Sequence, residues 1–153
     1  MPDSLDGPAS GHLSDALNGV SAEPILVVDV VGRPASYSSA AQAPWQAAVR
    51  VAISGTGVIP RDCRFGVRIS FRTPVPNNAN EVWDIDNLIK PTLDAMEGVF
   101  GARHWHGPQQ AADDKVDYLV ASKRTVRAGE APGARIEVVE FVGSCDAHLR
   151  AIP

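Results

Sequence analysis

A turn-forming connection over residues 73–80 leads into an acidic, helix-forming stretch, Val82-Trp83-Asp84-Ile85-Asp86-Asn87-Leu88-Ile89-Lys90. Asp86 and Asn87 are both favourable N-cap residues, and apolar residues recur at helical spacing beyond them. We therefore expect a helix that begins at one of these two residues and runs to Met96 or Glu97. Its buried face is expected to consist of Leu88, Ile89, Leu93 and Met96.

Four segments are predicted to be strands. Residues 25–31 form a dense run of β-branched residues, and residues 65–72 alternate apolar and polar side chains as a half-buried strand does. Residues 116–122 and 136–142 are expected to be the last two strands. Because they follow each other along the chain, we expect them to pair as a hairpin.

A further helix is predicted over residues 44–54, where Trp45, Val49 and Ile53 recur every fourth residue. The element order is then β-α-β-α-β-β. This order indicates a single α+β domain over residues 23–153, with a small mixed β-sheet and two helices packed on it. Residues 1–22 are rich in small and polar residues without periodicity, so we expect a disordered or weakly ordered N-terminal arm.

The composition is that of a soluble domain, with 153 residues of which 44% are hydrophobic and 21% charged. No stretch reaches the roughly 20 apolar residues of a membrane helix, and the first residues do not resemble a secretion signal. Cys63 and Cys145 lack metal-ligand spacing and are expected to be free thiols. We therefore expect a cytoplasmic protein that does not enter a membrane.

The net charge of −4 argues mildly against a protein that coats nucleic acid. The charges are unevenly distributed, because residues 61–153 carry thirteen acids and twelve bases whereas residues 1–60 carry five and two. The basic residues therefore fall in the same part of the chain as the acidic motif. Bound divalent cations would neutralise much of that motif, so the net charge alone does not exclude a nucleic-acid substrate.

Asp84 and Asp86 flank Ile85. On an extended segment, residues two apart point to the same side, so both carboxylates can converge while Ile85 faces the core. Mg²⁺ prefers such oxygen ligands and keeps several waters, which leaves room for substrate phosphate oxygens. The alternative is a solvated turn in which Asp86 only caps the helix. An EF-hand loop is excluded, because Ile89 stands at its glycine position.

Lys90 lies one turn beyond Asp86 and one turn before Asp94. It belongs either to a ladder of surface ion pairs or to an active site, where a fixed cation stabilises charge on a phosphoryl group. We interpret Asp94 as structural. Asp113-Asp114 either completes a three-acid cluster with the first two aspartates or forms an acidic turn.

The segment His104-Trp105-His106 is expected to be a loop that contacts DNA rather than a transition-metal site, because no Cys or further His lies near it in the sequence. Other basic residues lie on the predicted strand 65–72 and after the strand 116–122. For the latter group, a solvated strand end is an equal alternative. The candidate DNA-binding residues are Arg68, Arg72, Arg103, Lys123, Arg124 and Arg127.

In combination, these motifs resemble the RusA family of Holliday-junction resolvases of bacteria and their prophages. The similarity covers about forty residues in one order, and a weaker similarity exists at residues 30–34. The segment between Gly98 and Asp113 is longer than is usual in the family. The matching residues are Asp84-Ile85-Asp86-Asn87-Leu88-Ile89-Lys90-Pro91-Thr92-Leu93-Asp94-Ala95-Met96, Gly98-Val99, Asp113-Asp114, Val116-Asp117-Tyr118 and Lys123.

This resemblance implies a homodimeric endonuclease that uses Mg²⁺, or Mn²⁺ in its place, and resolves four-way DNA junctions by paired symmetric nicks during recombination and repair. It also implies that Asp84, Asp86 and either Asp113 or Asp114 ligate the metal, with Asp113 the better fit, and that Lys90 supports the transition state. Two other functions remain open. One is a less selective Mg²⁺ nuclease that acts on flaps or other branched DNA, and the other is a catalytically silent DNA-binding module.

Overall fold

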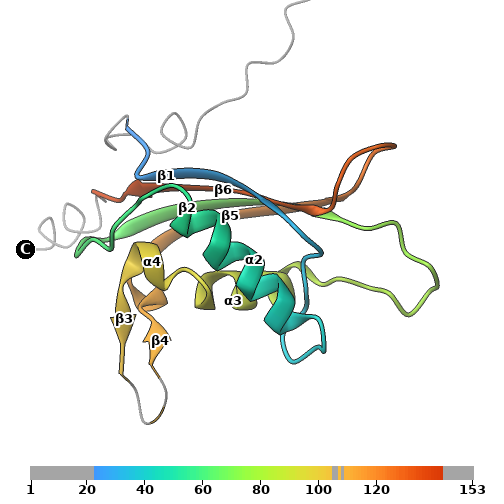
Figure 1. The fold of residues 1–153 in the computed structure, drawn as a ribbon, viewed down its shortest axis with the longest axis horizontal. Coiled ribbons are helices and arrows are strands. Elements are labelled where there is room, and N and C mark those ends of the chain that lie inside the picture. Colours follow the sequence, from blue (N-terminus) through green and yellow to red (C-terminus); the bar gives the residue numbers. More distant parts are fainter. Residues whose placement is uncertain (1–22, 105–106, 108, 143–153) are drawn as a thin grey trace, which may run out of the picture.

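The computed structural model describes residues 23–104, 107 and 109–142. A four-stranded sheet lies on one side of this part of the chain, and the helices α2, α3 and α4 all cover the same face of it (Figure 1). The expected α+β architecture with a small mixed sheet is confirmed. The predicted N-terminal arm, residues 1–22, lies outside the described residues.

The sheet contains β1 (Leu26–Val31), β2 (Phe65–Thr73), β5 (Val116–Thr125) and β6 (Gly133–Glu140), in the spatial order β1-β6-β2-β5. β6 pairs antiparallel with both β1 and β2, whereas β5 pairs parallel with β2. The expected hairpin of the last two strands is therefore wrong, because β2 lies between them. The connection from β5 to β6 crosses the end of β2, where the Val126 N–H donates to the Thr73 carbonyl at 2.9 Å.

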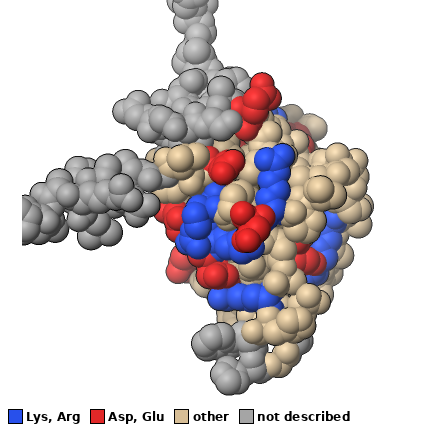
Figure 2. Space-filling view, turned by 90° about the vertical axis from the view of Figure 1, so that its left-hand side faces the viewer, with Lys and Arg blue, Asp and Glu red and all other residues tan. Residues whose placement is uncertain are grey.

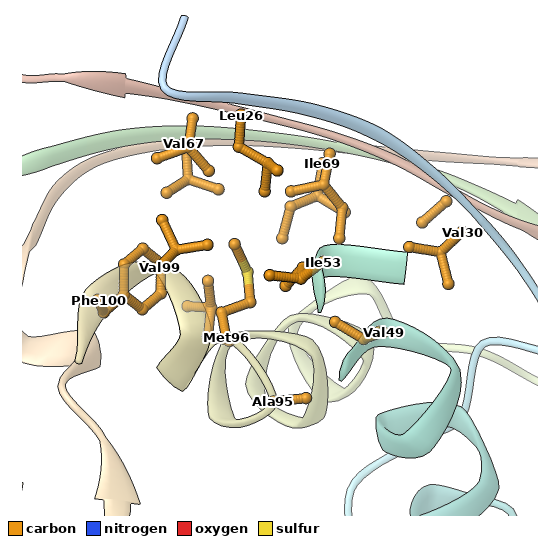
Figure 3. Packing of buried hydrophobic residues seen from close by; sticks show 14 of the residues in the cluster. Leu26, Val30, Val49, Ile53, Val67, Ile69, Ala95, Met96, Val99 and Phe100 are labelled. Atoms are coloured by element: carbon orange, nitrogen blue, oxygen red, sulfur yellow. The ribbon is translucent and has the colours of Figure 1, made fainter. Parts of the chain in front are cut away.

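The pattern of burial on β2 fits its central position in the sheet. Alternate residues of β2, namely Phe65, Val67, Ile69 and Phe71, are all buried against the helices. A strand that is central in the sheet satisfies its backbone groups on both sides while burying that face, which a strand at the edge cannot do. Figure 3 shows Met96 and Val99 pointing from the helix side toward Val67 and Ile69 on the sheet.

Three α-helices are described, one more than expected: α2 (Gln42–Ser54), α3 (Ile85–Asp94) and the short α4 (Glu97–Phe100). The predicted helix at residues 44–54 is confirmed as α2, which buries Trp45, Val49 and Ile53. The helix expected to run to Met96 or Glu97 ends earlier, at Asp94, and α4 continues the chain in a new direction. The segment between Gly101 and Ala112 was expected to be a loop. It contains a short hairpin of β3 (Ala102–Arg103) and β4 (Gln110–Ala111), followed by the 3₁₀ turn η1 (Asp113–Lys115).

Polar contacts fix α3 against α2. The Trp45 indole N–H donates to Thr92 Oγ1 at 3.0 Å, and the Thr92 hydroxyl donates in turn to the Leu88 carbonyl at 2.8 Å. Thr92 is fully buried, so these bonds satisfy groups that water cannot reach. The Gln46 side-chain amide adds a 3.1 Å bond to the Pro91 carbonyl. The helix that begins at the acidic motif is therefore held in one orientation.

Pro91 lies inside α3 rather than near the end of its first turn. Proline has no backbone N–H, so the Asn87 carbonyl four residues earlier loses its helical partner. The backbone N–H of Tyr37 replaces that partner and donates to the Asn87 carbonyl at 3.0 Å. The loop before α2 thereby compensates for the proline and ties itself to the first turn of α3.

Candidate active site

The acidic motif lies at the start of α3. Asp84 is extended and occupies the N-cap position, whereas Ile85 and Asp86 are already helical. The expectation that Asp84 and Asp86 share one extended segment is therefore wrong, and the helix begins earlier than predicted because the Asp84 carbonyl accepts the first helical bond from the Leu88 N–H at 3.2 Å. Both carboxylates are exposed. Neither forms a hydrogen bond or ion pair with another residue in the described part of the chain.

Lys90 links the acidic motif to the later Asp-Asp pair. Its ammonium group donates to Asp94 one turn further along α3, and to Asp113 Oδ2 at 3.2 Å. Partial burial by itself lowers the pKa of Lys90, but the hydrogen bonds to Asp94 and Asp113 outweigh burial and raise the pKa above its ordinary value. Lys90 is therefore a fixed cation at neutral pH. Asp94 has the structural role expected of it, since it holds this cation in place.

Asp113 lies between two cations. While Lys90 binds its Oδ2 atom, the Arg103 guanidinium binds its Oδ1 atom at 3.1 Å. The Asp113 side chain is only 15% exposed, whereas that of Asp114 is 53% exposed and has a longer contact of 3.4 Å with Arg103. Of the two aspartates, Asp113 is thus the one directed toward α3.

Neighbouring residues hold the turn that carries these two aspartates. The Arg64 guanidinium donates to the Asp114 carbonyl at 2.8 Å and pairs with the carboxylate of Asp117 at the start of β5. The hydrogen bond from Arg64 keeps the pKa of Asp117 below its ordinary value. Figure 2 views the molecule from the end where α4 and the β3–β4 hairpin lie, and basic and acidic side chains alternate on this surface. The surface is therefore of mixed sign.

No group of three His, Cys, Asp or Glu side chains is arranged to hold a metal ion within the described ranges. The expected cluster of Asp84, Asp86 and Asp113 is thus not found among the described residues, and both oxygens of Asp113 contact cations. The donor types nevertheless suit Mg²⁺, since the two carboxylates at the start of α3 offer oxygens that no other described residue occupies.

The six candidate DNA-binding residues do not share one surface. Lys123 lies on the helix-covered face of β5, beside its partner in the sheet ladder, the buried Phe71. Its ammonium group donates to the carbonyl of Trp83, the residue that precedes Asp84. Arg103 lies beside Asp113. The others lie on the opposite face of the sheet or in the connection that follows β5. These are Arg68, Arg72, Arg124 and Arg127.

Two residues of the opposite face already bind acidic side chains. Arg72 is bidentate to Asp29, at 2.8 and 3.2 Å, and its side chain is only 13% exposed. Arg124 is bidentate to Glu130, with both bonds at 2.6 Å. A phosphate would have to displace these carboxylates. Of the His104-Trp105-His106 loop, His104 is exposed, and the other two residues lie outside the described residues.

The Arg124–Glu130 pair predicts a pH dependence of stability. The hydrogen bonds from Arg124 and from the Arg127 N–H lower the pKa of Glu130 from 4.5 to about 2. Because the folded pKa is the lower one, the stabilisation is complete above pH 4.5 and disappears as the pH falls through about 2. In urea titrations, the wild type should therefore exceed Glu130→Gln in unfolding free energy near neutral pH, and the difference should shrink below pH 4.5. A difference that stays constant down to pH 2 would contradict the assignment.

Sequence reasoning missed two contributors to this region. Arg33 lies with its guanidinium carbon 5.7 Å from the centre of the Trp83 ring and its Nη2 atom 3.8 Å from Glu81. It thereby restrains the residue that precedes Asp84. Only the weak similarity at residues 30–34 had indicated a role for this part of the chain. The contact of Arg103 with Asp113 was also missed, because the hairpin that creates it consists of two-residue strands.

No protein-family model matches the sequence, and no curated protein matches it significantly. The functional inference therefore depends on the residues and their geometry. None of the described helices combines the length and the apolar character needed to cross a bilayer.

Proposed function

We propose that the protein is a Mg²⁺-dependent endodeoxyribonuclease of the RusA type that resolves four-way DNA junctions as a homodimer. The contact between Lys90 and Asp113 carries the proposal. It joins two motifs that lie 23 residues apart in the chain, at a distance of 3.2 Å. The resemblance described above places these same two motifs in one catalytic site. The exposed carboxylate of Asp86 lies on the same helix as Lys90, and that of Asp84 lies at the N-cap of this helix.

Each residue has a distinct role in this proposal. Asp84 and Asp86 would bind the metal through their exposed carboxylates, with Asp113 as the third ligand. Bound Mg²⁺ supplies a more acidic water for attack on the phosphodiester and neutralises charge on its oxygens. Lys90 remains protonated at neutral pH, and it stabilises negative charge that develops on the phosphoryl group. Arg103 keeps Asp113 oriented until the site is loaded.

The proposed dimer follows from the reaction. Resolution of a four-way junction requires two cuts in symmetrically related strands, and one copy of the site can make only one of them. A twofold dimer presents two identical sites with the same symmetry as the substrate. We therefore include a homodimer in the proposal.

A less selective nuclease is the second candidate, and the mixed-sign surface favours it. Junction binding draws much of its affinity from phosphate contacts with Lys and Arg. Here Arg72 and Arg124 are paired with acids, and the remaining basic candidates lie on different faces. A smaller phosphate footprint would suit a flap or a single-stranded branch better than four duplex arms.

Cleavage of a labelled synthetic four-way junction tests the proposal, with linear duplex and flap substrates of the same sequence as controls. Paired symmetric nicks confined to the junction and dependent on Mg²⁺ would support a resolvase. Metal-dependent cleavage of all three substrates would favour the less selective nuclease. Binding of the junction without any cleavage would leave a DNA-binding module and refute the enzymatic proposal.

Replacing Lys90 by Ala should lower the single-turnover cleavage rate by about 10²-fold, the usual cost of losing one electrostatic contact to a transition state. Junction affinity should change much less, because the proposed role is confined to the reaction step. Arg135→Ala is the control, since Arg135 lies on β6, outside the candidate site, and pairs with Glu137 at 3.1 Å. A loss of affinity with an unchanged rate would show that Lys90 only binds DNA.

A further inference from the structure

A cavity of about 310 Å³ lies between the end of β5 and the connection that leads from β2 to α3. Its lining includes apolar side chains from the connection, namely Pro76, Val82 and Trp83. Glu81 of the connection, Thr73 of β2 and Lys123, Arg124 and Thr125 of β5 complete the lining. The volume is at the lower end of the range for small-molecule sites and suits one nucleotide.

The cavity borders the segment that leads into the candidate active site. Trp83 lines it, and the next residue in the chain is Asp84. Lys123 fixes this position, because its ammonium group donates to the Trp83 carbonyl from β5. The Arg33 guanidinium packs over the Trp83 ring, which further limits movement of that side chain. A group that occupies the cavity would therefore contact the residue that precedes Asp84.

The charges around the cavity favour an anionic ligand. Lys123 has no carboxylate partner within the described part of the chain, where its only bond is to a carbonyl. Glu81 also lines the cavity, but its carboxylate accepts the Asn77 N–H at 2.9 Å and faces Arg33 at 3.8 Å. Its charge is therefore partly balanced, whereas that of Lys123 is not. Arg124, the other cation of the lining, is paired with Glu130 at 2.6 Å. The cavity therefore combines one unbalanced cation, apolar walls and two hydroxyl groups.

We propose that this cavity is a subsite for one unstacked deoxynucleotide of the strand that is cut, with its phosphate on Lys123 and its base or sugar against Val82 and Pro76. This inference rests on the proposed nuclease function and deepens it. Bases of a linear duplex remain stacked, whereas branch points and single strands offer bases that can leave the stack. The subsite would thus select branched or single-stranded DNA without requiring a large basic surface.

Two exposed valines of the same connection give a matched test. Val82 lines the cavity and is 67% exposed, whereas Val75 is 62% exposed and lies outside the lining. Binding of a fluorescent six-residue oligothymidylate to the full chain is measured by anisotropy in EDTA, so that cleavage plays no part. Val82→Glu should weaken binding about tenfold, since it places a carboxylate beside the phosphate, and Val75→Glu should change it less than about twofold.

Lys123→Gln should weaken binding to a similar degree, and Lys123→Arg should retain it. Equal effects of the two valine variants, or no binding by the wild type, would overturn the subsite. Junction cleavage measured in parallel separates this failure from that of the proposed function. If the wild type cleaves the junction but the two valine variants bind the oligonucleotide equally, only the subsite is refuted. If Val82→Glu alone loses binding and the wild type does not cleave the junction, a nucleotide site is supported and the nuclease is refuted.

Discussion

Replacing Asp86 by Asn should reduce junction cleavage by at least about 10³-fold, while the protein stays folded and still binds the junction. Asp86 is exposed at the start of α3 and bonds to no other described residue, so the fold does not depend on its charge. The amide has the same shape but lacks the negative charge that a divalent cation requires. The loss should therefore appear in the reaction rather than in stability or affinity.

Single-turnover cleavage at saturating enzyme measures the effect, and anisotropy in EDTA measures junction binding. Thermal unfolding with and without Mg²⁺ gives an independent readout, since a ligand that binds the folded state raises its stability. The shift seen with the wild type should be lost in Asp86→Asn. Asp62→Asn is the control, because the side chain of Asp62 is 99% exposed and lies outside the motif. Full cleavage by Asp86→Asn would refute the assignment of the site.

The local elements could be predicted where a periodic pattern extends over several turns or residues. The four-residue spacing of Trp45, Val49 and Ile53 predicted α2, and the alternation in β2 predicted a strand with one buried face. The start of α3 was placed one to two residues late, because Asp84, Asp86 and Asn87 are all acceptable caps. Local propensity does not distinguish among three such neighbours.

The order of the strands could not be predicted in the same way. Adjacent strands in the chain often form hairpins, so β5 and β6 were expected to pair. Their separation by β2 depends on which strand is buried on the helix side and paired on both edges, and this is a property of the whole sheet. The β3–β4 hairpin was missed for a different reason, since strands of two residues have no periodicity to detect.

The candidate site, too, could be predicted only in part. The sequence placed Lys90 and the Asp-Asp pair in one site only through the resemblance, and the 3.2 Å contact now brings Lys90 and Asp113 together. The ion-pair partners of the basic residues could not be predicted from the sequence, because Arg72 and its partner Asp29 are 43 residues apart in the chain. Such pairs decide which cations are available to DNA. Charge counts along the chain therefore overestimate the basic surface of this protein.

Replacing Gly133 by Ala should destabilise the fold by about 3–5 kcal/mol, a large effect for the addition of one methyl group. Gly133 is the first residue of β6 and lies between Val31 of β1 and Arg72 of β2. A Cβ atom there would clash with the Val30 carbonyl oxygen and lie 2.7 Å from a guanidinium nitrogen of Arg72. A carbonyl held in a sheet ladder cannot move aside as a flexible side chain can, so the pairing of β1 with β6 must yield.

Urea unfolding of the two proteins measures this effect, and Gly55→Ala is the matched control. Gly55 follows α2 with a φ of −65°, which any residue adopts, and an added Cβ would meet its nearest atoms at an ordinary 3.5 Å. Gly55→Ala should therefore be neutral or stabilise by about 0.4–1 kcal/mol through the unfolded chain. Equal effects at the two positions would mean that β1 can move away from β6 at little cost.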